Sequence, residues 1–269
     1  MITSPANPRV KWVRALQVKR RAREEESVFV IEGIRLAREA VAAARPVRLV
    51  FHTESLDARG RGLVNSLARL GAEVEVVSEA VMAACSSTET PPGLLAVLPI
   101  PDLPMPTPLT FALVADGLAD PGNLGTLLRT AAAAGVQAVL LTEGTVDAYN
   151  PKVVRGAMGA HLRLPIVTLQ APDLAPRLSG LEIWLAEAGQ GVPYHRVDWR
   201  PPVALVIGGE AHGHQVPLRS LPIHPVHIPM PGGTESLNAA VAGAIILFEI
   251  ARQRDSHRGS QRGSQRGSQ

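Results

Sequence analysis

Short apolar runs alternate with helical patterns through the first hundred residues. Four runs of apolar and β-branched residues are typical of strands, namely residues 28–31, 47–51, 74–77 and 94–98. Between them, apolar residues at helical spacing predict helices over residues 34–44 and 63–70. Because strands and helices alternate, we expect a small α/β domain over residues 1–98.

A proline-rich segment follows this region. Residues 99–108 hold five prolines in ten positions, in the sequence PIPDLPMPTP. Proline-rich segments are stiff and extended, and they do not form a packed core. We therefore predict a linker over residues 99–108 and a second domain over residues 109–254.

The second region has the pattern of a parallel α/β sheet. Its apolar runs predict strands over residues 111–115, 136–142, 183–186, 203–207 and 227–230. A helix with a leucine stripe is expected after Asn123, a second over residues 149–159, and a third, rich in small residues, from Leu237. Asn123 and Ser236 are the residues that we expect to cap the first and third helices, since both residue types accept hydrogen bonds from the first turn.

Composition narrows the class of protein. Hydrophobic residues make up 46% of the chain and charged residues 19%, which is typical of globular domains. No apolar run is long enough to span a membrane, the first residues lack the apolar core of a signal peptide, and Cys85 is the single cysteine. We therefore expect a cytoplasmic protein without internal disulfides. Residues 255–269 contain no apolar residue, so we expect a disordered basic tail, either inert or attracted to RNA.

The charge of the chain is compatible with a nucleic-acid partner but does not require one. The formal net charge is +3, and nearly all basic residues are arginines, which suit phosphate contacts but also follow from a GC-rich genome. Trp12 lies among basic residues, a pattern typical either of an RNA-binding surface or of a solvated amphipathic helix. The candidate RNA-binding residues are Arg20, Arg21, Arg35, Lys152 and Arg155.

Two predicted strands lead into glycine-rich loops. One continues into Gly208, Gly209 and Glu210, and the other into the sequence PGGTES, which ends at Ser236. Glycines let the backbone approach a ligand closely, so these loops are either a main-chain ligand cradle or ordinary strand-to-helix turns. No dinucleotide-binding glycine pattern or P-loop occurs, and no cysteine or carboxylate pattern completes a metal site around the nearby histidines, so we expect no metal.

Three segments resemble the signature motifs of the SpoU (TrmH-type) RNA 2′-O-ribose methyltransferases: residues 123–134, 206–213 and 228–242. They carry the family's pattern in its order and spacing, through Asn123, Gly125 and Arg129, then Gly208, Glu210 and Gly213, then Ser236, Leu237 and Asn238. Residues 1–98 resemble the family's N-terminal substrate-binding domain, which is similar to kink-turn-binding ribosomal proteins. The sequences VFVIEGIRLAREAV and TETPPGLLAV carry that likeness.

The resemblance implies a fold that composition does not. SpoU enzymes have an α/β sheet whose C-terminal part forms a deep trefoil knot, a rare exception to unknotted topology. They bind S-adenosylmethionine in the knot, and two subunits pair so that each site uses both chains. For this chain, the implied cofactor-binding residues are Thr142, Ala186, Gly208, Gly209, Glu210, Ile228, Met230, Ser236 and Leu237.

The resemblance also implies methyl transfer to a ribose 2′-hydroxyl of structured RNA. The implied catalytic residues are Arg129, Asn123, Glu210, Ser236 and Asn238, although a purely structural role stays open for Glu210 and Asn238. Arg129 falls close to the leucine stripe of its helix, where an arginine needs a partner or a polar cleft. Because a guanidinium holds its proton strongly, we expect Arg129 to steady the developing alkoxide and a flanking phosphate, while phosphate or water takes the proton.

Several alternatives stay open at this stage. The likeness of the N-terminal domain favours ribosomal RNA as the substrate, with transfer RNA as the alternative. An RNA-binding protein of the same fold without methyl transfer, and a methyltransferase that acts on a base nitrogen, are the other candidates.

Overall fold

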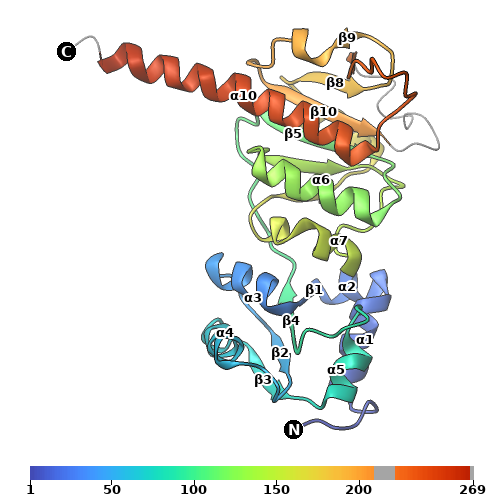
Figure 1. Ribbon diagram of the computed structural model, residues 1–269, viewed down its shortest axis with the longest axis vertical. Coiled ribbons are helices and arrows are strands. Elements are labelled where there is room, and N and C mark those ends of the chain that lie inside the picture. Colours follow the sequence, from blue (N-terminus) through green and yellow to red (C-terminus); the bar gives the residue numbers. More distant parts are fainter. Residues whose placement is uncertain (209–221, 267–269) are drawn as a thin grey trace. The chain divides into compact units, whose positions relative to one another are not determined.

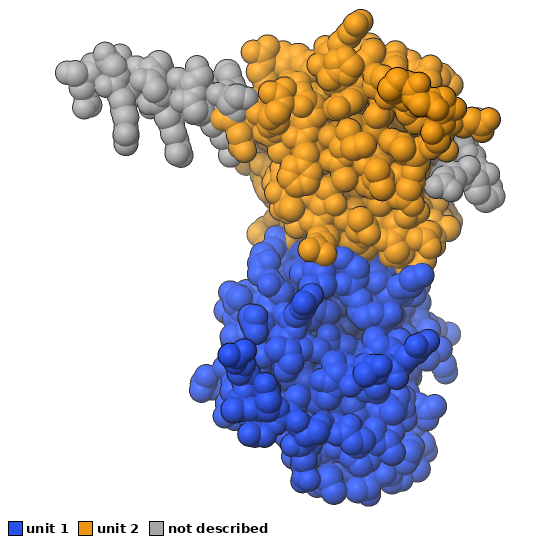
Figure 2. Space-filling view, viewed as in Figure 1, with its two compact units in different colours: residues 1–102, 147–163 blue, residues 103–146, 164–269 orange. Residues whose placement is uncertain are grey.

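The computed structural model describes residues 1–208 and 222–266. Contacts divide the chain into two compact units (Figure 2). Unit 1 consists of Met1–Asp102 and Asp147–Arg163, and unit 2 of Leu103–Val146 and Leu164–Gln269. The first break falls inside the proline-rich segment, whose residues after Pro99 belong to no helix or strand before Phe111.

Unit 1 is built on a four-stranded sheet in the order β1-β4-β2-β3. Strand β4 is antiparallel to β1 and β2, while β2 and β3 are parallel. The strands are β1 Val28–Glu32, β2 Leu49–His52, β3 Glu73–Val76 and β4 Leu94–Pro99. The helices are α1 Pro8–Val18, α2 Arg20–Glu26, α3 Gly33–Ala42, α4 Ala58–Arg69, α5 Glu79–Cys85, α7 Pro151–Ala157 and the 3-10 helix η1 Ala160–Leu162.

Alternate residues of β1 face two separate cores, because successive side chains of a strand point to opposite faces of the sheet. Phe29 and Ile31 pack with buried residues of α3 and α4 on one face. Val28 and Val30 pack with buried residues of α1 and α5 on the other. The unit is therefore a sheet covered on both faces.

The basic N-terminal segment forms two of these covering helices. Asn7 caps α1 through its side chain, Pro8 occupies the first turn, and a stripe of three buried residues faces the core. Trp12 is half-buried against this core, and the guanidinium carbon of Arg48 lies 5.0 Å from its ring centre. Trp12 therefore packs on the core of unit 1 as part of an amphipathic helix.

Residues 147–163 pack in unit 1, whereas we expected them in the second domain. The side chain of Arg23, only 3% exposed, forms an ion pair of 2.5 Å with Asp147 and donates a hydrogen bond to the carbonyl oxygen of Leu16. The ring centres of Tyr149 and His161 lie 5.2 and 6.0 Å from that of Phe29. Apart from the bond to Leu16, these contacts join parts of the chain that are more than a hundred positions apart.

Unit 2 is built on a seven-stranded sheet in the order β7-β6-β5-β10-β8-β11-β9. Every pairing within it is parallel, which confirms the predicted parallel α/β sheet. The strands are β5 Phe111–Asp116, β6 Ala138–Leu141, β7 Ile166–Thr168, β8 Glu182–Ala186, β9 Val192–Pro193, β10 Val203–Gly208 and β11 Ile223–His227. The strand predicted over residues 227–230 is wrong, because β11 ends at His227 after pairing with β8 and β9.

Helices cover both faces of this sheet. On one face, α6 Pro121–Ala133 packs along α10 Ala239–Arg266 (Figure 1). A Cβ atom added to Gly243 would lie 2.5 Å from Leu127 Cδ1, so this glycine allows the two helices to approach closely. On the other face, α8 Ala171–Arg177 contributes Leu174 to a core with β5, β8 and β10. The 3-10 helix η2 Tyr194–Arg196 follows β9.

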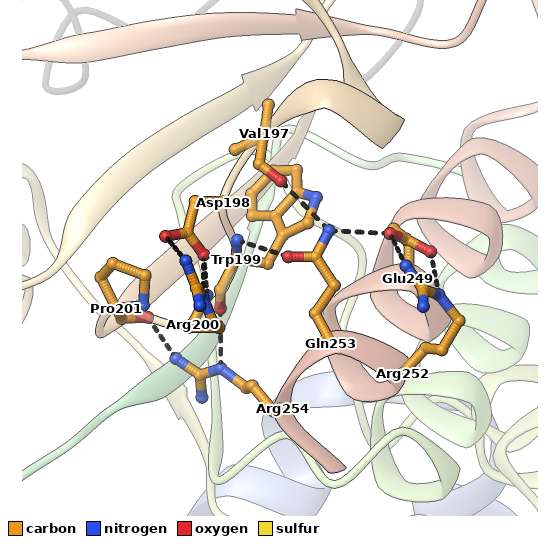
Figure 3. Close-up of polar contacts among 9 residues, drawn as sticks. All are labelled: Val197, Asp198, Trp199, Arg200, Pro201, Glu249, Arg252, Gln253 and Arg254. Atoms are coloured by element: carbon orange, nitrogen blue, oxygen red, sulfur yellow. Dashed lines mark hydrogen bonds and ion pairs between the residues drawn. The ribbon is translucent and has the colours of Figure 1, made fainter. Parts of the chain in front are cut away.

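The loop of residues 197–201 holds α10 in place (Figure 3). The side-chain oxygen of Gln253 accepts from the Trp199 amide at 3.0 Å, and its nitrogen donates to the Val197 carbonyl oxygen at 3.1 Å. Arg254 donates to the carbonyl oxygens of Trp199, Thr110 and Pro201. The start of β5 and the loop before β10 are thereby joined to one helix.

Helix α10 continues to Arg266, although we expected disorder from residue 255. That expectation relied on the absence of apolar residues, which removes tertiary packing but not the backbone hydrogen bonds that extend an existing helix. None of the helices in the described part of the chain is long and apolar enough to cross a membrane.

Candidate functional site

A pocket of about 320 Å³ opens in unit 2 at the carboxyl ends of three adjacent strands, β10, β8 and β11. Open parallel sheets bind their ligands at this edge, and the volume falls in the roughly 300–1,000 Å³ range of small-molecule sites. The first turns of α10 and the loop before it close the pocket. Its lining residues are Ala186, Glu187, Ala188, Ile207, Gly208, Val226, His227, Ile228, Met230, Ser236, Leu237, Ala239, Ala242 and Ile246.

The walls combine apolar side chains with backbone that lies outside the sheet. Met230, Leu237 and Ile246 are among the apolar residues, while Ile228 follows the last paired residue of β11. Apolar walls with a few placed polar groups are typical of pockets for flat organic ligands. The arrangement therefore suits a heteroaromatic ring, with side chains against its faces and main-chain groups at its edge.

Six of the nine predicted cofactor-binding residues line this pocket, namely Ala186, Gly208, Ile228, Met230, Ser236 and Leu237. Thr142 does not line it. Its hydroxyl donates to Asp116 Oδ1 at 2.6 Å and accepts from the Gly117 amide at 3.1 Å, so it ties the end of β6 to the end of β5. Gly209 and Glu210 lie outside the described residues.

Two predicted catalytic residues from distant motifs touch each other. Asn238 Nδ2 donates to Asn123 Oδ1 at 2.8 Å, which joins the start of α10 to the first turn of α6. Asn238 Oδ1 also accepts from the amides of Ala240 and Val241. Asn238 directly follows Ser236 and Leu237, which line the pocket. The asparagine pair therefore lies next to the pocket wall that these two residues form.

The predicted helix caps were each misplaced by two or three residues. Asp120, and not Asn123, caps α6, because its carboxylate accepts from the Asn123 amide at 2.7 Å. Asn238, and not Ser236, caps α10. Asp and Asn accept hydrogen bonds from the first turn as well as Ser does, so residue type by itself does not identify the capping position.

The environment of Arg129 differs from the one expected, in which the guanidinium lies near the leucine stripe and needs a partner. Arg129 is exposed on α6, it does not line the pocket, and within the described residues it makes no hydrogen bond or ion pair. An arginine has five donors, and those of Arg129 have no partner among the described residues, so they can serve a ligand.

The five candidate RNA-binding residues all lie in unit 1. Arg20 pairs with Glu24 at 2.6 Å and Arg21 with Glu25 at 2.7 Å, so carboxylates offset both charges locally. Arg155 donates to the hydroxyl of Ser87, whereas Arg35 and Lys152 are exposed. The structure therefore separates these residues into paired and exposed cations.

Sequence reasoning missed eight lining residues: Glu187, Ala188, Ile207, Val226, His227, Ala239, Ala242 and Ile246. Helical spacing from Ala239 through Ala242 to Ile246 was a usable signal for the face of α10. Glu187 and Ala188 directly follow Ala186, which was predicted to bind the cofactor, so their position in the sequence was the other signal. Across the residues that the structure describes, no three His, Cys, Asp or Glu side chains are grouped to hold a metal ion.

Two family models match the chain. The SpoU rRNA Methylase family matches residues 110–248, and the MRM3-like substrate binding domain matches residues 7–96. Among curated relatives, the 23S rRNA (guanosine(2553)-2′-O)-methyltransferase RlmP of Bacillus subtilis is 33% identical, over 93% of this chain and 98% of that protein.

Solved structures agree with these matches over nearly the whole chain. The SpoU methyltransferase AviRb from Streptomyces viridochromogenes, in complex with the cofactor AdoMet, has a TM-score of 0.83 at 29% identity and covers 93% of this chain and 99% of that one. An rRNA methyltransferase from Sinorhizobium meliloti has a TM-score of 0.83 at 28% identity, with coverage of 93% and 96%.

Proposed function

This chain belongs to the SpoU rRNA methylase family, and on that premise we propose that it transfers the methyl group of S-adenosylmethionine to a ribose 2′-hydroxyl of ribosomal RNA. The observation that carries the proposal is the hydrogen bond between Asn123 and Asn238 beside the pocket. It brings the first and third motif segments together at the strand ends where a cofactor fits. The relatives' substrates support ribosomal RNA rather than transfer RNA.

The residues of the pocket fit S-adenosylmethionine. Met230 and Leu237 supply apolar surface for the faces of the adenine, and the backbone of Gly208 and Ile228 lies where its edge would be recognised. The hydroxyl of Ser236 belongs to the same wall. When bound, the cofactor supplies an activated methyl group on a sulfonium, so the protein's tasks are alignment and management of one proton.

Arg129 is the residue that we assign to the 2′-hydroxyl. A guanidinium carries no acceptor for a proton, so Arg129 steadies the developing alkoxide and a flanking phosphate, and the 2′-hydroxyl proton passes to phosphate or water. The hydrogen bond between Asn123 and Asn238 holds the first and third motif segments together. In unit 1, the exposed Arg35 and Lys152, together with Arg20, Arg21 and Arg155, contact the RNA backbone.

The complete site takes two chains. Arg129 lies on α6 but does not line the pocket of its own chain, which supports a homodimer in which a partner's Arg129 reaches the methyl group. The resemblance to SpoU enzymes further implies a trefoil knot in the C-terminal part of unit 2. The similarity to the bacterial enzyme RlmP supports a location in the cytoplasm.

The reaction is tested with purified protein, labelled S-adenosylmethionine and total RNA from a strain that lacks this gene. We expect label in ribosomal RNA, and digestion followed by mass analysis should yield a 2′-O-methylated nucleoside. A methylated base would instead support a base-nitrogen methyltransferase. Cofactor binding without incorporation into any RNA would support an RNA-binding role.

The role of Arg129 is tested by Arg129→Lys. Lysine keeps the charge but loses the planar fork that holds two oxygens, so we expect methylation at neutral pH to fall about 10²- to 10³-fold while cofactor affinity stays unchanged. Arg177→Lys, at an exposed arginine on α8, is the matched control and should retain full activity. Full methylation by Arg129→Lys would contradict the assignment.

A further inference from the structure

Glu187 stands apart from the other residues that line the pocket. Most of these residues are apolar or small, and Glu187 is the single carboxylate among the lining residues that the structure describes. A carboxylate at the edge of an apolar pocket is costly when a ligand displaces water, unless the ligand supplies hydrogen-bond donors. A ligand group with O–H or N–H donors would therefore be favoured next to this residue, in addition to its protein partners.

The turn after β8 fixes the position of this carboxylate. The Glu187 amide donates to the Val226 carbonyl oxygen at 2.9 Å, which continues the alignment of β8 with β11. The side-chain nitrogen of Gln190 donates to Glu187 Oε1 at 3.2 Å. The carbonyl oxygen of Gln190 in turn accepts from His227 Nδ1 at 3.0 Å. Glu187 is thus attached to β11 through both its backbone and its side chain.

The register of the strands places Glu187 beside the expected base-binding wall. Val226 pairs with Ala186, so Glu187 lies next to His227 and close to Ile228, whose backbone is assigned to the adenine edge. In S-adenosylmethionine the ribose is bonded to the base at C1′ and to the sulfur through C5′, so a base held at Ile228 would bring the ribose hydroxyls within reach of Glu187.

We infer that the carboxylate of Glu187 accepts hydrogen bonds from the two ribose hydroxyls of the bound cofactor and so selects a ribonucleoside ligand. The inference rests on the proposed function of the pocket. Two neighbouring hydroxyls supply two donors, and an ionised carboxylate has about four acceptor positions, so Glu187 keeps its existing partners while it binds them. A carboxylate performs the same task for the ribose of dinucleotides in other α/β folds.

The experiment compares binding of 5′-methylthioadenosine and its 2′,3′-dideoxy analogue by calorimetry. Both lack the amino-acid part and the positive charge of the cofactor, so they differ only in the two hydroxyls. We expect the natural protein to prefer the diol on the order of tenfold to a hundredfold, as for hydrogen bonds to a charged group. Glu187→Ala should abolish this preference by weakening the diol ligand alone, and Glu187→Gln should keep part of it.

Glu182→Ala is the matched control, because it removes an exposed carboxylate from the opposite end of the same strand and should keep the full preference. Circular dichroism checks that each variant is folded. If Glu187→Ala keeps the preference, or weakens both ligands equally, the residue shapes the loop or meets the cofactor's positive charge, and the inference is wrong. If the natural protein binds neither of these ligands nor S-adenosylmethionine, both the inference and the proposed function are wrong.

Discussion

Single residues decide the shape of the pocket edge. Gly189 and Gly191 both have positive φ in the turn that follows β8, at +70° and +74°. No atom lies within 4 Å of a Cβ added to Gly189, whereas a Cβ on Gly191 would overlap the carbonyl oxygen of Pro225. Sequence alone makes these two glycines equivalent, and only the position of β11 distinguishes them.

We therefore predict unequal costs for two alanine substitutions. Gly189→Ala meets only backbone strain and should destabilise the protein by about 1–2 kcal/mol. Gly191→Ala adds a clash with a strand, so it should lower the free energy of unfolding by about 3 kcal/mol or more and weaken S-adenosylhomocysteine binding. Urea unfolding and calorimetry measure both effects, and equal losses for the two variants would contradict the argument.

At the scale of elements, the segment 147–163 combines a correct local prediction with a wrong assignment to a domain. Its helix was expected over residues 149–159 and is present as α7. Its packing with β1 depends on Arg23 and Phe29, which sequence patterns do not connect to it. Helical periodicity identifies a helix, but it does not identify the surface on which that helix packs.

The same segment should make unit 1 sensitive to acid. His161 is buried, and burial lowers its pKa to about 4, while Nε2 donates to the Ala148 carbonyl oxygen at 2.7 Å. The unfolded chain, with the ordinary pKa of 6.5, binds this proton more readily, so stability is full above pH 6.5 and falls as the pH drops towards 4. Between pH 7 and pH 5 we expect a loss of about 2 kcal/mol.

Urea unfolding at both pH values, followed by circular dichroism, measures this loss. His161→Phe should remove most of the pH dependence, although it also removes the bond to Ala148 and so lowers stability at pH 7. His195→Gln, at an exposed histidine of unit 2, should leave the pH dependence unchanged. An unaltered slope in His161→Phe would assign the effect to another group.

At the scale of the whole molecule, α10 presents apolar side chains to solvent. Val241 and Phe248 are 47% and 53% exposed, and they lie seven residues apart, on one face of the helix. Large exposed apolar residues that share a face mark interaction sites more often than isolated ones do. This face supports the proposal that two copies of the chain pair through unit 2.

Light scattering coupled to size exclusion tests that proposal. We expect the natural protein to be a dimer, and Phe248→Glu to shift it towards the monomer, because a charge would then be buried in the interface. Val18→Glu, at an 81% exposed residue of unit 1, serves as the control and should remain dimeric. Methylation should fall with the dimer if each site uses both chains, and a monomeric natural protein would contradict the proposal.

The sequence by itself determined the local elements and the family. Apolar runs and leucine stripes are local patterns, so most strands and the main helices were predicted within a few residues, and the SpoU resemblance is confirmed. Gly208 and Leu237, which were predicted as cofactor residues from motifs that the family model covers, line the pocket.

The tertiary structure decided the features that depend on distant partners. The contact of Asn123 with Asn238 spans 115 positions, and that of Arg23 with Asp147 spans 124. The same applies to Glu187, whose place in the pocket comes from the pairing of β8 with β11. Periodicity and motif spacing report on neighbours along the chain, whereas these contacts depend on which strands pair and which helices pack, and that is set by the fold as a whole.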